Sequence, residues 1–191
     1  MSEVVITDAT VLIYLAKLDD IDYLNRLFEE VYVPETVYEE VVTHGLEEQY
    51  ADALSVEEAT ESFIDVRKLT DETEGRADEI QESSGLERGE CTAIALAEDE
   101  RARCLTDDHA ARKTAESLNV DVGGTIYVLL EALDRGQLSF EGYVEKLDDL
   151  TDNGFRMSAS LYRKAVDAGE DLTPNFPRTN RFYPGVTHQR P

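Results

Sequence analysis

The sequence has little cysteine, little histidine and no long apolar run, and each shortage excludes a class of protein. It holds 2 Cys and 3 His in 191 residues. Cys91 and Cys104 fall in different predicted elements, so we expect reduced structural thiols in a cytosolic protein. The His and Cys residues are too few, and not spaced as ligands, for a zinc site. No stretch reaches the roughly 18 to 20 uncharged apolar residues of a membrane helix. The N-terminus shows no signal peptide, so we expect a cytoplasmic protein without a membrane partner.

Basic residues are also scarce. Eighteen Lys and Arg face 42 Asp and Glu, which gives a net charge of −24. One interpretation is an acidic protein that repels nucleic acid in ordinary buffer. The other is a protein from a halophile, where molar salt screens charges beyond about 3 Å. Acidic residues occur in nearly every predicted helix and Lys is rare, which favours the halophile. In that case the net charge does not exclude an RNA substrate.

Apolar runs alternate with amphipathic stretches along most of the chain. This alternation predicts an α/β fold of three layers, with a central parallel five-strand sheet and helices on both faces. The predicted strands cover residues 3–7, 31–33, 63–69, 103–106 and 120–122. Helices are predicted over residues 13–18, 21–28, 35–42, 45–62, 71–83, 86–97, 109–118, 125–135, 139–151 and 158–168.

The length suits one core domain with additions at its C-terminal end. We predict a core α/β domain over residues 1–138, a helical extension over 139–171 and a tail over 172–191. The tail has no acidic residue and carries three Arg together with Phe176, Phe182 and Tyr183. Two roles stay open for the tail: an arm that clamps the acidic body or a second subunit, and an arm that contacts RNA.

Carboxylates follow two of the predicted strands at the point where each strand ends. Asp8 comes directly after the run Val4-Val5-Ile6-Thr7, and Asp107 and Asp108 come after Leu105-Thr106. In open α/β sheets, ligands bind outside the carboxyl ends of the strands. Glu40 lies on the helix that follows the second strand, and Glu90 lies in the opening turn of an Ala-rich helix. We expect these carboxylates to converge on Asp8 in one pocket.

Each of these acids also has a purely structural interpretation. Asp108 is well suited to cap a helix N-terminus, and Glu90 would complement the dipole in a first turn. Glu40 and its neighbour Glu39 would suit a solvated helix face, and the local spacing does not decide between these two as a ligand.

Several crowded carboxylates cannot all ionise without a cation. Mg²⁺ or Mn²⁺ would meet that need, because such hard ions take oxygen ligands. The chemistry typical of such a site is phosphoryl transfer with a metal-activated water.

Four short motifs in this order resemble the PIN-domain nucleases, including the VapC-like toxins of toxin–antitoxin pairs. They are Ile6-Thr7-Asp8-Ala9-Thr10, Val33-Pro34 with the helix that follows, Gly89-Glu90 within an Ala-rich helix, and Leu105-Thr106-Asp107-Asp108. The resemblance covers about residues 3–135. It implies a Mg²⁺- or Mn²⁺-dependent ribonuclease with an RNA substrate, a homodimeric assembly and an antitoxin partner. It also implies a set of site residues. These are Asp8, Glu40, Glu90 and Asp108 as catalytic metal ligands, Asp107 as a fifth ligand, and Thr10 as an assisting hydroxyl.

A function from a different class stays open. A PIN-like protein that holds a partner and cleaves nothing would carry the same fold. The four acids at the expected positions favour the nuclease, and metal-dependent cleavage of RNA would separate the two functions.

Overall fold

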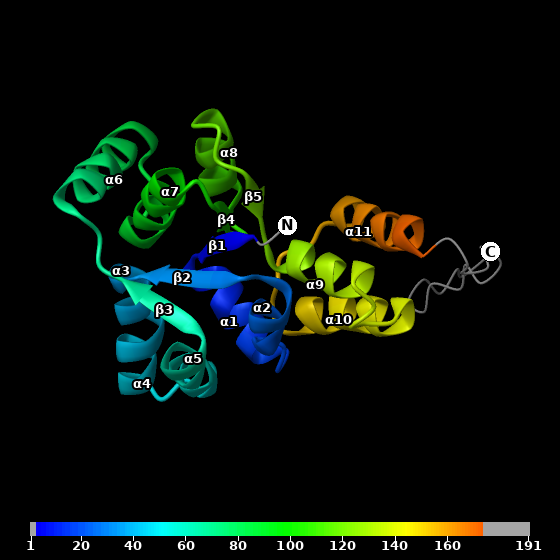
Figure 1. Cartoon of the computed structure of the whole chain (residues 1–191). Coiled ribbons are helices and arrows are strands. Elements are labelled where there is room, and N and C mark those ends of the chain that lie inside the picture. The colour runs from blue at the N-terminus through cyan, green and yellow to red at the C-terminus, as the bar shows by residue number, and fades with distance from the viewer. Residues whose placement is uncertain (1–2, 174–191) are drawn as a thin grey trace, which may run out of the picture.

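The computed structural model describes residues 3–173. Its sheet has five parallel strands in the order β3-β2-β1-β4-β5, which confirms the predicted fold class (Figure 1). The strands are β1 (Val4–Thr7), β2 (Glu30–Pro34), β3 (Ile64–Arg67), β4 (Arg103–Leu105) and β5 (Val122–Gly123). From β1 the chain goes on to β2 and β3 on one side of β1, and it then crosses to β4 and β5 on the other side. This is the topological switch point of the sheet.

Helices cover both faces of the sheet. On one side lie α1 (Ala9–Lys17), α2 (Asp22–Leu27), α5 (Ala51–Ser62) and α9 (Thr125–Asp134), and on the other α6 (Asp71–Ser84), α7 (Arg88–Glu100) and α8 (His109–Ser117). Successive side chains of each strand point to opposite faces of the sheet, so each strand contributes to both cores. In β1, Val5 belongs to the core on the α1 side and Ile6 to the core on the α7 side.

The helix predicted over residues 35–42 is longer than expected and contains a wider turn. It begins as α3 (Glu35–Tyr38), passes through a π-helical turn, η1 (Glu39–Thr43), and ends as α4 (His44–Glu47). Val41 and Val42, which lie in the π turn, are both buried. Turns of this kind occur often at functional sites.

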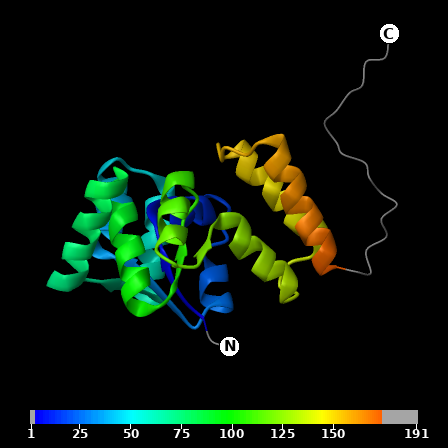
Figure 2. The same ribbon diagram turned by 90° about the horizontal axis from the view of Figure 1, so that it is seen from above.

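The last two helices, α10 (Phe140–Asp152) and α11 (Ala159–Leu172), pack beside α9, and the three form a group at one side of the sheet (Figures 1 and 2). Tyr143 and Leu147 of α10 and Val166 of α11 belong to the same core cluster as Val5 of β1. The Tyr143 hydroxyl donates a hydrogen bond of 3.0 Å to the carbonyl of Ala165. The proposed extension therefore shares its core with the rest of the fold.

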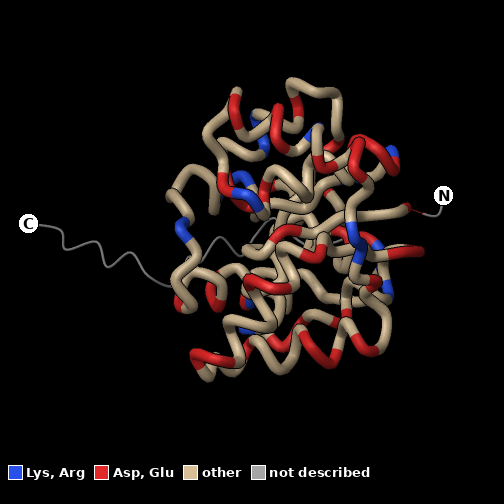
Figure 3. Tube along the Cα trace, turned by 90° about the vertical axis from the view of Figure 1, so that its left-hand side faces the viewer, with Lys and Arg blue, Asp and Glu red and all other residues tan. Residues whose placement is uncertain are grey.

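Other expectations have mixed outcomes. Cys91 and Cys104 are buried free thiols, as predicted. Between residues 3 and 173, none of the helices has the length and apolar character needed to cross a membrane. Acidic residues outnumber basic ones over the face shown in Figure 3. All but the first two residues of the predicted tail, 172–191, lie outside the described residues.

Candidate active site

The carboxyl ends of β1 and β4 bring Asp8 next to the segment 106–108. The two strands are paired with Thr7 opposite Leu105, and the amide of Asp8 donates a 3.0 Å hydrogen bond to the carbonyl of Leu105. Because the strands are parallel, the residues that follow them emerge at the same edge. This edge is the switch point of the sheet, where open α/β folds bind ligands.

Asp8 is buried, and its two carboxylate oxygens have different surroundings. Oδ1 accepts hydrogen bonds from the Thr10 hydroxyl at 2.8 Å and from the Val11 amide at 3.1 Å, so it caps α1. Oδ2 is buried and has no hydrogen-bond partner. Burial raises the pKa of Asp8 to about 7. The Thr106 hydroxyl opposes this shift most, followed by the Val11 amide and the Thr10 hydroxyl, whereas repulsion from Asp107 adds a smaller increase. An unpartnered buried carboxylate oxygen is costly unless a proton or a cation accompanies it.

Thr10 links the two strand ends. Its hydroxyl donates to Asp8 and accepts a longer hydrogen bond, 3.4 Å, from the backbone amide of Asp107. One hydroxyl therefore holds the Asp8 carboxylate in register with the segment that leads to Asp108.

Asp108 is the N-cap of α8, as the structural interpretation of this residue predicted. Its Oδ1 accepts from the amides of Ala110 and Ala111 at 2.7 and 2.8 Å. The side chain is half-buried, and Oδ2 takes no part in the cap. Capping fixes the orientation of the carboxylate and does not compete with a second role for Oδ2.

Asp107 has a structural task that uses both of its oxygens. Oδ1 accepts from the Thr125 amide at 2.9 Å and Oδ2 from the Thr125 hydroxyl at 2.5 Å, which ties β4 to the start of α9. Gly124 leaves room for this contact, since a Cβ there would lie 2.4 Å from Asp107 Oδ1. Burial raises the pKa of Asp107. These two hydrogen bonds give Asp107 a structural role between β4 and α9 that the other four proposed ligands do not have.

Glu40 lies against the first turn of α7. A Cβ at Gly89 would be only 2.9 Å from Glu40 Oε2, so the absence of a side chain at Gly89 lets the two segments approach. Four residues before Glu40, on the same helix side, the Thr36 hydroxyl shares a 2.7 Å hydrogen bond with the Thr92 hydroxyl of α7. This places Glu40, of the pair Glu39 and Glu40, beside α7.

Glu90 is both a helix cap and a member of a row of acids. Its Oε2 accepts from the Glu87 amide at 3.0 Å in a capping box. Burial raises the pKa of Glu90, and repulsion from Asp108, Glu87 and Glu40 adds to this. Burial also raises the pKa of Glu40, with a contribution from Glu87. Glu40 and Asp108 therefore both lie close enough to Glu90 to raise the pKa of Glu90.

Comparison with known proteins identifies the family of this chain. A family model described as a PIN domain matches residues 4–170. The chain belongs to the PIN-domain family. PIN domains are generally nucleases, and they typically bind divalent metals. The match includes α10 and α11, which the sequence motifs did not cover. No curated protein matches the chain.

The acids in the described part of this PIN domain do not form a closed metal cage. Within residues 3–173, no three Asp, Glu, His or Cys side chains are gathered closely enough to hold a metal ion together. The chemistry of the donors nevertheless fits a hard divalent cation, because all of them are carboxylates and Asp8 Oδ2 has no other partner. Asp8, Glu40, Glu90 and Asp108 are the residues that would hold such an ion.

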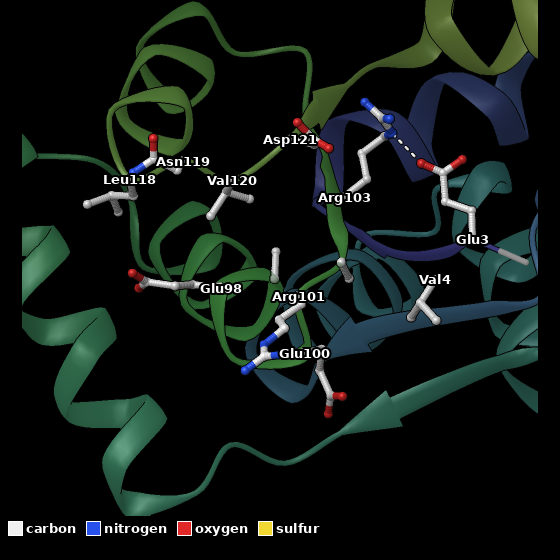
Figure 4. Close-up of a pocket in the computed structure, with 12 residues that line it drawn as sticks. Glu3, Val4, Glu98, Glu100, Arg101, Arg103, Leu118, Asn119, Val120 and Asp121 are labelled. Atoms are coloured by element: carbon white, nitrogen blue, oxygen red, sulfur yellow. Dashed lines mark hydrogen bonds and ion pairs between the residues drawn. The ribbon is translucent and has the colours of Figure 1, made fainter. Parts of the chain in front are cut away.

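One cavity of this PIN domain lies away from these acids. It has a volume of about 820 Å³ and is found at the amino edge of the sheet, between the starts of β1 and β4 and the ends of α7 and α8 (Figure 4). Arg103 and Glu3 form a 2.5 Å ion pair at its border. None of the five proposed ligands lines it. The expectation that the acids share one pocket is therefore not met by this cavity.

Proposed function

We propose that the protein is a Mg²⁺- or Mn²⁺-dependent endoribonuclease that hydrolyses RNA phosphodiester bonds at the carboxyl edge of the sheet. The observation that carries this proposal is Asp8. Asp8 lies at the switch point of the sheet, and its buried Oδ2 accepts no hydrogen bond, so this oxygen would be open to a cation. When bound, the divalent ion activates a water and neutralises charge on the phosphate.

The side chains around Asp8 would prepare the site for this chemistry. Thr10 orients the Asp8 carboxylate by its hydrogen bond to Oδ1, which leaves Oδ2 as the free ligand atom. The cap formed by Asp108 Oδ1 fixes the second strand-end carboxylate in the same way. Glu40 and Glu90 bring further negative charge from α7 and the helix beside it. The mutual repulsion among these acids would be relieved by a cation.

The experiment that tests this proposal compares wild-type protein with Asp8→Asn on a structured RNA in molar KCl. We expect cleavage with Mg²⁺ or Mn²⁺, none with EDTA, and a loss in Asp8→Asn greater than the roughly 10–100-fold typical of residues that only support a metal ligand. Glu39→Gln serves as the matched control for Glu40→Gln, and only the latter should lose activity. Equal cleavage in EDTA, or an active Asp8→Asn, would refute the proposal.

The resemblance to VapC-like proteins supports a more specific role. We propose that the chain is the toxin of a toxin–antitoxin pair, acts in the cytoplasm of a halophile and forms a homodimer. Co-expression with the product of a neighbouring gene that restores growth would support the toxin role. Unimpaired growth of a host that expresses the active enzyme alone would refute it.

One observation favours the alternative, a PIN-fold protein that binds a partner without cleavage. The described acids do not surround a single point. Titration calorimetry with Mn²⁺ decides between the two: binding that is lost in Asp8→Asn supports the nuclease, and no binding at millimolar Mn²⁺ supports the silent binder.

A further inference from the structure

A basic segment packs against α1, the helix that Asp8 caps. Residues 153–166 contain Arg156, Arg163 and Lys164 and no acidic residue, in a chain with 42 Asp and Glu. The segment comprises the connection between α10 and α11 and the first half of α11. All three basic side chains are exposed. None of them takes part in the ion pairs found within residues 3–173.

The basic residues of this segment are in no ion pair, like Lys68, Arg101, Arg112 and Lys113, whereas seven other described basic residues are. Arg76 and Arg88, for example, each contact two carboxylates, at Glu79 and Glu98 and at Glu74 and Asp78 respectively. Arg163 makes only a 3.3 Å hydrogen bond from Nε to a carbonyl of its own helix. Its charge, and those of the other two residues, are therefore available to an external anion.

Contacts with α1 hold the start of the segment on the helix that begins at Asp8. The rings of Tyr14 and Phe155 meet edge to face with centroids 5.0 Å apart, and the Tyr14 hydroxyl donates to the carbonyl of Gly154 at 3.2 Å. Tyr14 lies four residues after Thr10, hence on the same face of α1 and roughly 6 Å along its axis. Lys17 continues this face, with its Nζ 5.6 Å from the Tyr14 ring.

We propose that residues 153–166, with Lys17, bind the phosphate backbone of single-stranded RNA as it approaches Asp8. The inference rests on the proposed nuclease function. Its physical basis is charge complementarity: an RNA strand is repelled by most of this surface, and the basic segment offers unpaired cations next to the face that begins at Thr10. Asp152 and Asp167 flank the segment in sequence, which limits the basic surface to this length.

The test measures RNA binding in the Asp8→Asn background, where the RNA stays intact. Arg156→Gln/Arg163→Gln is compared with Arg26→Gln/Arg101→Gln, which removes the same charge at the amino edge. Arg26 lies in the last turn of α2, shortly before β2 begins, and Arg101 borders the cavity of Figure 4. Fluorescence anisotropy with a short labelled single-stranded RNA over a KCl series gives the Kd and its salt dependence. Circular dichroism first establishes that each variant is folded.

We expect the Arg156/Arg163 variant to weaken binding about tenfold or more at the lowest salt that keeps the protein folded, and to reduce the slope of log K against log salt by about 1.4. The control should change neither quantity appreciably. Should the double variant fail to fold, Arg163→Gln alone, on an exposed helix side, is expected to give half the change in slope.

Two results would overturn the inference. In one, the two double variants bind RNA equally, so that only net charge matters. In the other, Arg156→Gln/Arg163→Gln binds RNA normally but has a lower mass in solution, which would make the segment an interface between copies of the chain. Cleavage by the wild-type protein is scored separately. If the arginine variant loses RNA binding but the wild-type protein cleaves no RNA, the binding surface is supported and the nuclease function is refuted. If the wild-type protein cleaves RNA but the arginine variant binds RNA normally, the nuclease function is supported and the binding surface is refuted.

Discussion

Replacing Asp8 by Asn should change how stability depends on pH. The carboxyl of Asp8 is buried with one unpartnered oxygen, and its pKa in the folded protein is about 7, compared with an ordinary value of 3.8. The unfolded chain therefore releases this proton at a lower pH than the folded protein does. Asp8 destabilises the wild-type fold progressively as the pH rises through this window, and the loss levels off above about pH 7.

The size of the effect follows from the two pKa values. Their difference corresponds to about 4 kcal/mol at full ionisation, and the part that develops between pH 5 and pH 8 is about 2–3 kcal/mol. Asn can still accept the hydrogen bonds that Thr10 and Val11 donate to Oδ1. Its amide would occupy the place of Oδ2 without a partner, at a cost of about 1–3 kcal/mol that does not vary with pH. The pH dependence, rather than the stability at one pH, carries the prediction.

The assay is urea unfolding of both proteins in molar KCl and EDTA at about pH 5 and pH 8. We expect the stability of Asp8→Asn relative to wild type to rise by about 2–3 kcal/mol over this interval. Asp134→Asn, at an exposed position at the end of α9, removes the same charge and should show no such rise. Excess Mg²⁺ at pH 8 should stabilise wild type more than Asp8→Asn, because the ion binds the ionised carboxylate of the folded state.

A relative stability that stays constant between the two pH values would refute the argument, since it would mean that Asp8 ionises alike in the folded and unfolded states. An equal rise in Asp134→Asn would attribute the effect to net charge instead.

Three other changes test the arrangement around the site. Gly89→Ala should lower metal-dependent cleavage at least tenfold, because the new Cβ would lie 2.9 Å from Glu40 Oε2. The control Gly75→Ala, whose Cβ would have nothing within 4 Å, should retain activity and raise the free energy of unfolding by about 0.5–1 kcal/mol. Thr125→Val removes the hydroxyl that donates a hydrogen bond to Asp107. Thermal unfolding should therefore show a stability lower by about 1–3 kcal/mol. The melting temperature of the wild-type protein should rise from low to molar KCl, because salt screens repulsion within a chain of net charge −24; a flat or falling curve would contradict the halophilic interpretation.

Sequence alone was enough to predict the sheet and the position of two acids. Alternating apolar runs predicted five parallel strands, and all five are present. A carboxylate directly after a buried strand must emerge at the carboxyl edge, so the strand pattern alone places Asp8 and Asp108 there. The N-cap role of Asp108 was also predictable, because capping depends on backbone groups only two and three residues away.

The neighbours of each acid, in contrast, depend on the tertiary structure. Local spacing leaves Glu39 and Glu40 equivalent, and the choice of Glu40 depends on Gly89, some fifty positions along the chain. The hydrogen bonds that both oxygens of Asp107 accept from Thr125 of α9 join two separate elements, so the sequence pattern did not predict them. The basic segment next to α1 was likewise visible only through the contact between Tyr14 and Phe155. Periodicity and capping act over a few residues, whereas the surroundings of a side chain depend on packing between elements that are distant in sequence.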